Sequence, residues 1–303
     1  MRGRRQPLAL MPFLAVLWAA GVGAESRALI VREDSAVSRQ TAEIVTRDLT
    51  SSGWTLAEVT VGFETPLPPH PEQEQAIIAL GARALIAAIR HAGGKPVVAA
   101  LIGQSSVDEM TWSTGDRLSV ILLDQPVDRW INLVQTAFPN LQQVGMVAGP
   151  ANQKMAKAVE RRMSDRRLAL SVEQISSPEE VVPALERLLP RMGLFLALPD
   201  PMVHNRNSVQ PLLLTTYRAG IPVVAYSESY LQAGAVLALY STVPQIAAQV
   251  IETLQQFQEG KPPPTVQPPR YFTVGVNSAV ARSLGLSLPS GADLTARLRS
   301  QGQ

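Results

Sequence analysis

The sequence predicts an α/β fold of two compact units, each with a mostly parallel sheet. Apolar runs of strand length alternate with segments of helical period along most of the chain, which is typical of βαβ units. The alternation starts again after Pro126, so two units are expected rather than one. With 303 residues that are 46% hydrophobic and 17% charged, the chain has enough apolar material to bury a substantial core.

The composition excludes several classes of protein. The chain has 27 Lys and Arg against 25 Asp and Glu, and only 5% of its residues are aromatic. This near-neutral balance argues against nucleic-acid binding, which needs a basic surface and often stacking rings. Cysteine is absent, which excludes disulfide scaffolds, thiol catalysis, Cys-ligated zinc and iron–sulfur clusters.

Residues 1–24 have the pattern of a cleavable secretory signal peptide. A basic start, MRGRRQP, is followed by an apolar run from Leu8 to Gly23 and by small residues up to Ala24. The alternative, an uncleaved anchor, is disfavoured because the run contains Pro12 and is shorter than the roughly 20 apolar residues of a spanning helix. No cysteine at the cut can carry a lipid. Cleavage removes three arginines and no acid, leaving 24 basic and 25 acidic residues, and the expected location is a Gram-negative periplasm.

The first unit is predicted to span residues 25–123. Apolar residues recur near helical spacing between Val37 and Leu49, and Gly53 follows as a helix-ending glycine. A Pro-rich loop at 64–71 is followed by a short helix-like stretch. The other predicted elements are strands 28–32, 56–61, 76–80, 96–102 and 118–123, helices 35–52 and 82–92, and a helical turn at 105–110.

The second unit is predicted to span residues 124–238, and a tail at 239–303 has no matching half. Such a tail needs a sheet to join, so it is expected to return to the first unit. The predicted strands are 144–148, 168–175, 194–198, 222–225, 235–239 and 271–276. The predicted helices are 127–138, 152–163, 178–189, 205–219, 244–258 and 278–284, with a Pro-rich segment at 260–269.

Ligands of open parallel sheets bind outside the carboxyl ends of the strands, where loops and helix N-termini converge. Many residues at these ends are small or hydroxylic and open a helix, so that N–H groups could face an anion. Ordinary N-capping is the alternative explanation for each position alone, and it stays open. The residues predicted to line a cleft between the units are Ser35, Gln104, Ser105, Asp124, Asn152, Asp200, Ser227, Glu228 and Tyr240, with Asp200 the strongest candidate.

Catalytic arrangements are not evident in the sequence. The histidines are His70, His91 and His204, and no nucleophile elbow, zinc-protease pair or phosphate-binding loop occurs. Asp200 and His204 could supply two metal ligands, but a third is missing, so helix capping by Asp200 is preferred. Trp130 is expected in the core rather than against a ligand. No cofactor, metal or catalytic residue is predicted.

Several segments resemble the ABC transporter substrate-binding proteins that include the tryptophan/tyrosine-binding type. The resemblance covers residues 121–289 and depends on the order and spacing of its motifs. They are LPDP at 198–201 with Asn205 and Gln210, AGIPVVAYSESYLQAGAVLALYS at 219–241, VNSAVARSLGLSLP at 276–289, and the segment from Leu133 through Phe138-Pro139-Asn140 to Val147. The resemblance implies a periplasmic binding protein type I fold, with two Rossmann-like lobes that close over a small ligand about a three-stranded hinge.

The resemblance also implies positions in the cleft for Asp200, Ser227, Glu228 and Tyr230. Two acids there would suit an amine-bearing ligand, because charge-assisted hydrogen bonds are strong in a closed cleft. The first lobe departs from the family pattern: Gly81-Ala82-Arg83 replaces a Thr/Ser-Pro turn, and Gly103-Gln104-Ser105 replaces an Asp-Pro. An amino-acid specificity is therefore not carried over, and Arg83 is expected to be solvated rather than to clamp a carboxylate.

The leading hypothesis is a monomeric periplasmic solute-binding protein that delivers a small organic ligand to an ABC permease in the inner membrane. Hinge closure would be stabilised by contacts with both lobes. The alternative keeps the fold but makes the protein a sensory or accessory module for a receptor kinase or an envelope partner. An envelope enzyme is disfavoured because no nucleophile, base and orienting group form a motif.

Overall fold

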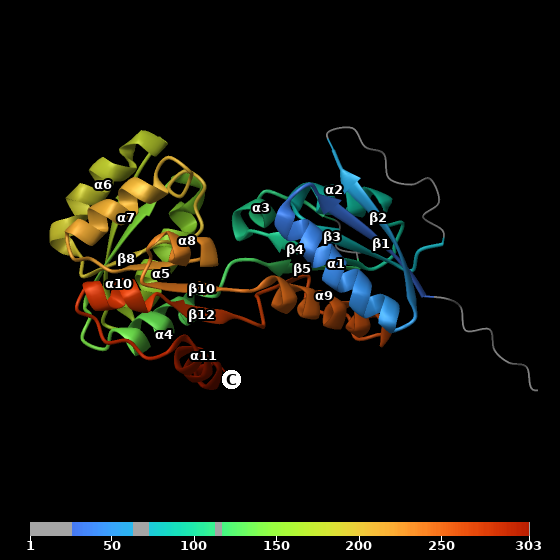
Figure 1. Cartoon of the computed structure of the whole chain (residues 1–303). Helices are drawn as coiled ribbons and strands as arrows, with labels where there is room; N and C mark the ends of the chain where they lie inside the picture. The colour runs from blue at the N-terminus through green and yellow to red at the C-terminus, as the bar shows by residue number, and fades with distance from the viewer. Residues whose placement is uncertain (1–25, 63–72, 113–116, 303) are drawn as a thin grey trace, which may run out of the picture.

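The computed structural model describes residues 26–62, 73–112 and 117–302, which form two six-stranded sheets flanked by helices (Figure 1). The predicted α/β class is therefore confirmed. The predicted signal peptide at 1–24, the Pro-rich loop at 64–71 and His70 lie outside the described residues. No helix in the described ranges combines the length and apolar content needed to cross a bilayer.

The first sheet is entirely parallel and has the order β11-β5-β4-β3-β1-β2. Its strands are β1 (Ser26–Glu33), β2 (Trp54–Val61), β3 (Ala76–Leu80), β4 (Val97–Ile102), β5 (Leu118–Leu122) and β11 (Val266–Gln267). Alternate residues of the central strands point to opposite faces, and both faces are buried. One face packs on α1 (Ala36–Ser51) and α9 (Val243–Gln258), and the other packs on α2 (Ala82–His91) and α3 (Gln104–Asp108). Burial on both faces explains why β3 reads AIIAL without a polar residue.

The second sheet has the order β12-β10-β9-β8-β6-β7 and is parallel except for the β10–β12 pair. Its strands are β6 (Gln143–Ala148), β7 (Ala169–Gln174), β8 (Leu194–Leu196), β9 (Val223–Ala225), β10 (Leu237–Tyr240) and β12 (Thr273–Val276). One face packs on α4 (Val127–Ala137), α5 (Gln153–Ser164), α10 (Ser278–Ser283) and α11 (Gly291–Gln301). The other packs on α6 (Val181–Leu188), α7 (Val209–Arg218) and α8 (Glu228–Ala233), with short 3-10 turns at Pro150–Asn152, Pro178–Glu180 and Leu189–Arg191.

Three segments connect the two sheets, and we call each sheet with its helices a lobe. The crossings run from β5 to α4, from β10 to α9 and from β11 to β12 (Figure 1). One residue from each crossing joins a short hydrogen-bonded chain. The side-chain amide of Gln125 donates to Ser241 Oγ at 3.0 Å, and Ser241 Oγ donates to the carbonyl oxygen of Tyr271 at 2.6 Å. The hinge is thus held together by polar contacts between its own strands.

The tail differs from its prediction. Residues 239–303 were expected to return to the first unit, but only α9 and β11 do so. β12 pairs antiparallel with β10 at the edge of the second sheet, and α11 packs on α4 and β12. The physical reason is that Leu294 and Leu298, one helical turn apart, are buried in the core of the second lobe.

Smaller differences concern individual elements. The short strand β11 and the helices α8 and α11 were not predicted. No helix precedes β3 within 73–75, the described part of the expected helix-like stretch. The helix expected at 205–219 begins at Val209, because turns occupy the preceding residues and the Ser208 hydroxyl donates to the carbonyl oxygen of Val203 at 2.6 Å.

Candidate functional site

A cleft of about 650 Å³ lies where the two lobes meet. Both lobes and two of the hinge crossings contribute to its walls. Lobe 1 and its helices supply Ser35, Val37, Leu101, Gly103, Val243, Pro244 and Ile246, lobe 2 supplies Trp130, Pro199, Tyr226, Ser227, Glu228, Leu239 and Tyr240, and the crossings supply Leu123, Asp124, Gln125, Ser241 and Thr242. The carboxyl ends of β1, β4, β5 and β10 all reach this space, which is the arrangement expected of a ligand site in parallel sheets.

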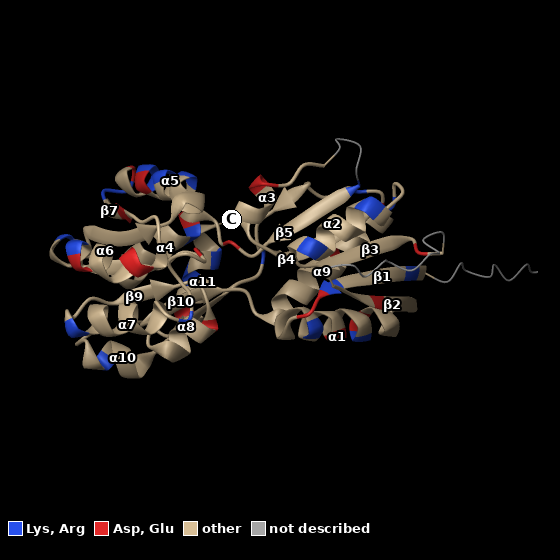
Figure 2. Ribbon diagram, turned by 90° about the horizontal axis from the view of Figure 1, so that it is seen from above, with Lys and Arg blue, Asp and Glu red and all other residues tan. Residues whose placement is uncertain are grey.

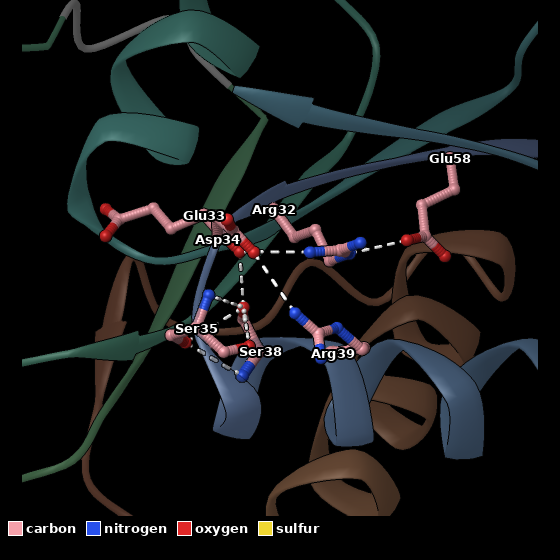
Figure 3. Close-up of polar contacts among 7 residues, drawn as sticks. All are labelled: Arg32, Glu33, Asp34, Ser35, Ser38, Arg39 and Glu58. Atoms are coloured by element: carbon pink, nitrogen blue, oxygen red, sulfur yellow. Dashed lines mark hydrogen bonds and ion pairs between the residues drawn. The ribbon is translucent and has the colours of Figure 1, made fainter. Parts of the chain in front are cut away.

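Ser35 caps α1 at the edge of the cleft. Its hydroxyl accepts a hydrogen bond from the backbone N–H of Ser38 at 3.1 Å, and Ser38 Oγ accepts one from the backbone N–H of Ser35 at 3.3 Å (Figure 3). Neighbouring charges are paired with one another rather than facing the cleft. Arg32 pairs with Glu58 on β2, and Arg39 pairs with Asp34 at 3.2 Å (Figure 3). Serine is thus the polar residue that this end of β1 presents to the cleft.

Asp124 follows β5 at the first crossing. Its Oδ2 accepts a hydrogen bond from the backbone N–H of Gln104 at 2.7 Å, which ties the crossing to the start of α3. Burial raises the pKa of the Asp124 carboxyl, and the bond from Gln104 opposes this rise. The charged carboxylate is therefore incompletely solvated where it borders the cleft.

Leu101 reaches the cleft through an irregularity in β4. Its φ of 63° lies in the left-handed region, and the β4–β5 register shifts between Ala99 and Ile102. A left-handed conformation costs a residue with a Cβ about 1–2 kcal/mol. Backbone strain of this kind is concentrated at functional sites, and here it belongs to a leucine that lines the cleft.

Ser227 and Glu228 begin α8 on the other wall. Ser227 Oγ accepts a hydrogen bond from the backbone N–H of Tyr230 at 3.2 Å, and Glu228 occupies the exposed first turn. Burial, together with the Glu228 charge, raises the pKa of the Tyr240 phenol. A carboxylate and an aromatic ring therefore face the same space from lobe 2.

His204 and Tyr230 pack against Tyr226 and support this wall of the cleft. His204 lies with its ring centroid 5.6 Å from that of Tyr226 and 5.4 Å from that of Tyr230, and its Nδ1 is 3.0 Å from the Tyr230 hydroxyl. Burial lowers the pKa of His204 to about 4, although the charge of Asp200 opposes this. His204 is therefore neutral near pH 7 and packs as part of the wall.

Five of the nine predicted residues line the cleft: Ser35, Asp124, Ser227, Glu228 and Tyr240. The other four are not in its lining. Gln104 and Ser105 lie in the short helix α3, where the Gln104 side-chain amide donates to Asp108 Oδ1 at 2.6 Å. The Asn152 side-chain amide donates to the carbonyl oxygen of Pro199 at 2.5 Å.

Asp200, the strongest candidate from sequence, has a different environment. The residue is only 4% exposed, and its carboxylate accepts hydrogen bonds from the backbone N–H groups of Gly149 at 2.8 Å and Met202 at 3.0 Å. Val203 N–H adds a longer one at 3.4 Å. The carboxylate therefore joins the loops that follow β6 and β8. It does not cap the next helix, as the alternative explanation expected, because the N-cap position of α7 is occupied by Ser208. Within the described residues, no cluster of three or more His, Asp or Glu side chains could hold a metal ion.

Sequence reasoning missed the apolar part of the lining. Leu101, Leu123 and Tyr226 lie at or just after the ends of strands that were predicted correctly. They were missed because the prediction considered mainly polar residues that could cap a helix. Trp130 is both core and wall: it is 2% exposed and packs in the core of lobe 2, as predicted, yet it borders the cleft. One sequence feature could have identified Leu123 and Gln125 as lining residues. They lie between the last buried strand of the first unit and the first helix of the second unit, where a cleft between the units would be.

Comparisons with known proteins identify relatives by family and by fold. The family model described as "ABC transporter substrate binding protein" matches residues 71–293. No curated protein matches the sequence. A substrate-binding protein with adhesive properties from Clostridium difficile, in a ligand-free, open structure, has a TM-score of 0.71 at 15% identity and covers 88% of this chain and 96% of its own.

Two further solved structures extend over slightly more of the chain. A conserved domain protein from Vibrio cholerae has a TM-score of 0.61 at 17% identity, covering 90% of this chain and 98% of its own. A domain from Streptococcus pneumonia in complex with L-Trp also has a TM-score of 0.61, at 10% identity, with the same coverage of 90% and 98%. At these identities the likeness establishes the fold, which is that of two-lobed periplasmic binding proteins of type I.

Proposed function

The chain belongs to the family of ABC transporter substrate-binding proteins, and from this premise we propose that it captures a small organic ligand between its lobes and delivers it to an ABC permease. The cleft carries the proposal, because both lobes and the hinge contribute to a single cavity of about 650 Å³. This volume falls within the range of roughly 300–1,000 Å³ that is common for small-molecule sites.

Exposed apolar residues in the cleft support binding followed by closure. Val37 on α1 is 46% exposed, Leu123 at the first crossing is 42% exposed, and both line the cleft. Large apolar side chains left this open gain free energy when a ligand or the other lobe covers them. In our proposal two lobes move relative to one another. Lobe 1 comprises residues 26–122 and 243–267, and lobe 2 comprises residues 127–240 and 273–301.

The proposed mechanism is closure about the three crossings. A ligand that touches both lobes binds the closed form better than the open form, and only this difference in affinity shifts the population. The permease would then recognise the closed, loaded form. We further propose that the chain acts as a monomer in the periplasm after removal of residues 1–24.

A ligand screen of the mature protein, beginning at Glu25, tests the proposal. A thermal-shift library of amino acids, amines, nucleosides, sugars and vitamins is followed by calorimetry on each hit. A ligand present at a hundred times its Kd adds about 2.7 kcal/mol to the free energy of unfolding. No shift from any compound class would contradict capture of a small organic ligand.

Two matched variants locate the site of any hit. Leu123 lines the cleft and Leu214 lies on α7 outside it, yet they are similarly exposed at 42% and 46%. We expect Leu123→Ala to weaken binding about tenfold, because part of a leucine side chain's burial energy is lost. Leu214→Ala should leave affinity unchanged. Equal effects would place binding elsewhere.

Delivery to a permease, as opposed to signalling, is tested in a Gram-negative host. Reconstituted permease from the same genome should show ATP hydrolysis that increases when the loaded protein is added. Stimulation of a receptor kinase without transport would favour the sensory alternative.

A further inference from the structure

The charged side chains that line the cleft are all negative. Asp124 and Glu228 bring two carboxylates, and no Lys, Arg or His is among the described residues that line the space. A ligand anion would therefore meet two negative charges and no cation. A ligand cation would meet two acceptors, one at the hinge and one on α8 of lobe 2.

Nearby arginines are engaged elsewhere. Arg129 is bound at the hinge, where it donates to Gln125 Oε1 at 2.6 Å and to the carbonyl oxygen of Pro269 at 2.9 Å. Its guanidinium carbon lies 4.1 Å from the centroid of the Phe272 ring. Arg32 and Arg39 are paired with acids next to β1 (Figure 3). None of these guanidinium groups lines the cleft.

The helices that begin at the cleft have their first-turn N–H groups partly occupied by their own side chains. Ser35 caps α1 and Ser227 caps α8, and Thr242 caps α9 by accepting from the backbone N–H of Gln245 at 3.4 Å. In α1 and α9 the side chain of the third helical residue also accepts a hydrogen bond from the backbone N–H of the capping residue. Helix N-termini bind anions through such N–H groups, and here the chain itself uses several of them.

Strand-end acids occupy further N–H groups. Glu33 accepts from the backbone N–H of Arg83 at 2.8 Å at the start of α2, and Asp124 does the same for Gln104. Asp200 accepts from the backbone N–H of Gly149. Backbone N–H groups in the loops after β3, β4 and β6 are thus already bound to carboxylates of the protein itself. A ligand carboxylate would have to compete with these side chains for the same N–H groups.

The rest of the lining suits an organic cation with an apolar body. Trp130, Tyr226 and Tyr240 border the cleft, and aromatic faces attract ammonium groups. Leu101, Leu123 and Val37 provide aliphatic surface. Burial already raises the pKa of Asp124, and a cationic partner would stabilise its charged form.

We propose that the cleft selects an organic cation, an amine or quaternary ammonium on an apolar body, and excludes compounds that carry a carboxylate. This inference rests on the proposed function and narrows its ligand to one charge class. Amino acids fall outside that class because each carries a carboxylate beside its amine.

Calorimetry with probe triplets tests the inference directly. Tryptamine, tryptophan and indole-3-propionate share one ring but carry the amine alone, both groups and the carboxylate alone; phenethylamine, phenylalanine and 3-phenylpropionate form a second triplet. We expect the amine of at least one triplet to bind, and to do so at least about tenfold more tightly than its amino acid. The carboxylates should not bind.

Charge variants connect the selectivity to the named residues. Glu228→Gln should weaken amine binding about tenfold, since a charge-assisted hydrogen bond becomes a neutral one, and Asp124→Asn should act likewise. Glu160→Gln is the control, because it removes one exposed negative charge on α5 of the same lobe. Figure 2 shows that α5 carries charges of both signs. Leu123→Lys should abolish amine binding, and Leu214→Lys, at a similarly exposed position, should not.

The outcomes separate the inference from the function on which it rests. If an amino acid or a carboxylate binds as tightly as its amine, or if a neutral compound of the wider library is the only ligand, the cation proposal is overturned and solute capture stands. If neither the triplets nor the library bind, both are overturned. If amines bind and Glu228→Gln and Glu160→Gln have equal effects, the assignment to this cleft is wrong.

Discussion

The carboxylate of Asp200, in the loop after β8, accepts a hydrogen bond at 2.8 Å from the backbone N–H of Gly149, the residue that follows β6. β6 and β8 are neighbours in the second sheet. The same relationship recurs in the first sheet, where Asp124 after β5 binds Gln104 after β4. An acid that ends one strand thereby fixes the loop after the adjacent strand. These bonds hold the loops of each lobe in place beside the cleft.

Replacing Asp200 should affect stability more than binding. Asp200→Ala leaves three backbone N–H groups without their carboxylate, and we expect the free energy of unfolding to fall by about 3 kcal/mol. Urea unfolding followed by circular dichroism measures the loss. Glu228→Gln, at an exposed position, serves as the control and should change stability by less than about 0.5 kcal/mol. An Asp200→Ala protein of unchanged stability that binds ligand poorly would return Asp200 to the site.

Much of the fold follows from the sequence because its signals are local. The alternation of strand-length and helical segments identified eleven of the twelve strands in the described residues and missed only β11. The other main error was to assign the last strand, β12, to the first sheet rather than the second. β11 has only two residues, too few for any periodicity. β12 is equally compatible with either sheet until α11 is known to pack on α4, a contact between segments more than 150 residues apart.

The site was predictable to the level of strand ends but not of side-chain direction. Ser35 and Asp200 share the same sequence signal, a polar residue after a buried strand, yet one lines the cleft and the other is 4% exposed. The difference depends on which way each loop turns, and this is decided by long-range bonds such as the one from Gly149 to Asp200. Leu101 lines the cleft through a positive φ that no local pattern signals.

The contact between Gln125 and Ser241 should influence the balance between open and closed forms. Gln125→Leu removes its 3.0 Å bond to Ser241 and leaves Arg129 without the acceptor Oε1 at 2.6 Å. We expect a broader distribution of interlobe distances and a free energy of unfolding lower by about 2 kcal/mol. Single-molecule fluorescence energy transfer between dyes on α2 and α6 measures the distribution of interlobe distances. Gln174→Leu, at an exposed position on β7, should leave the distribution unchanged, and an identical effect of both variants would refute a role of the hinge contact.

A buried amide on α9 should be essential for attaching the last crossing to lobe 1. Gln249 donates to Gln267 Oε1 and to the carbonyl oxygen of Pro268, both at 3.1 Å, and accepts from the backbone N–H of Arg270 at 2.8 Å. Gln249→Ala should therefore lower the free energy of unfolding by about 3 kcal/mol. Gln255→Ala, an exposed change of the same kind on the same helix, is the control for helix propensity. Equal unfolding midpoints in urea for the two variants would show that the network contributes little.

His204 should make stability dependent on pH in a defined window. Burial lowers its pKa from 6.5 to about 4, so between these values the unfolded chain binds a proton that the folded chain does not. Stability from this residue is fully present above about pH 6.5 and is lost as the pH falls toward 4, by about 3 kcal/mol at most. Other groups titrate in the same range, so the comparison must be with a variant. His204→Gln keeps a polar group near the Tyr230 hydroxyl and cannot titrate, and its melting temperature should fall less than that of the parent between pH 6.5 and pH 4. Thermal unfolding at half-unit pH intervals measures both proteins, and parallel curves would mean that His204 becomes protonated in the folded state without cost.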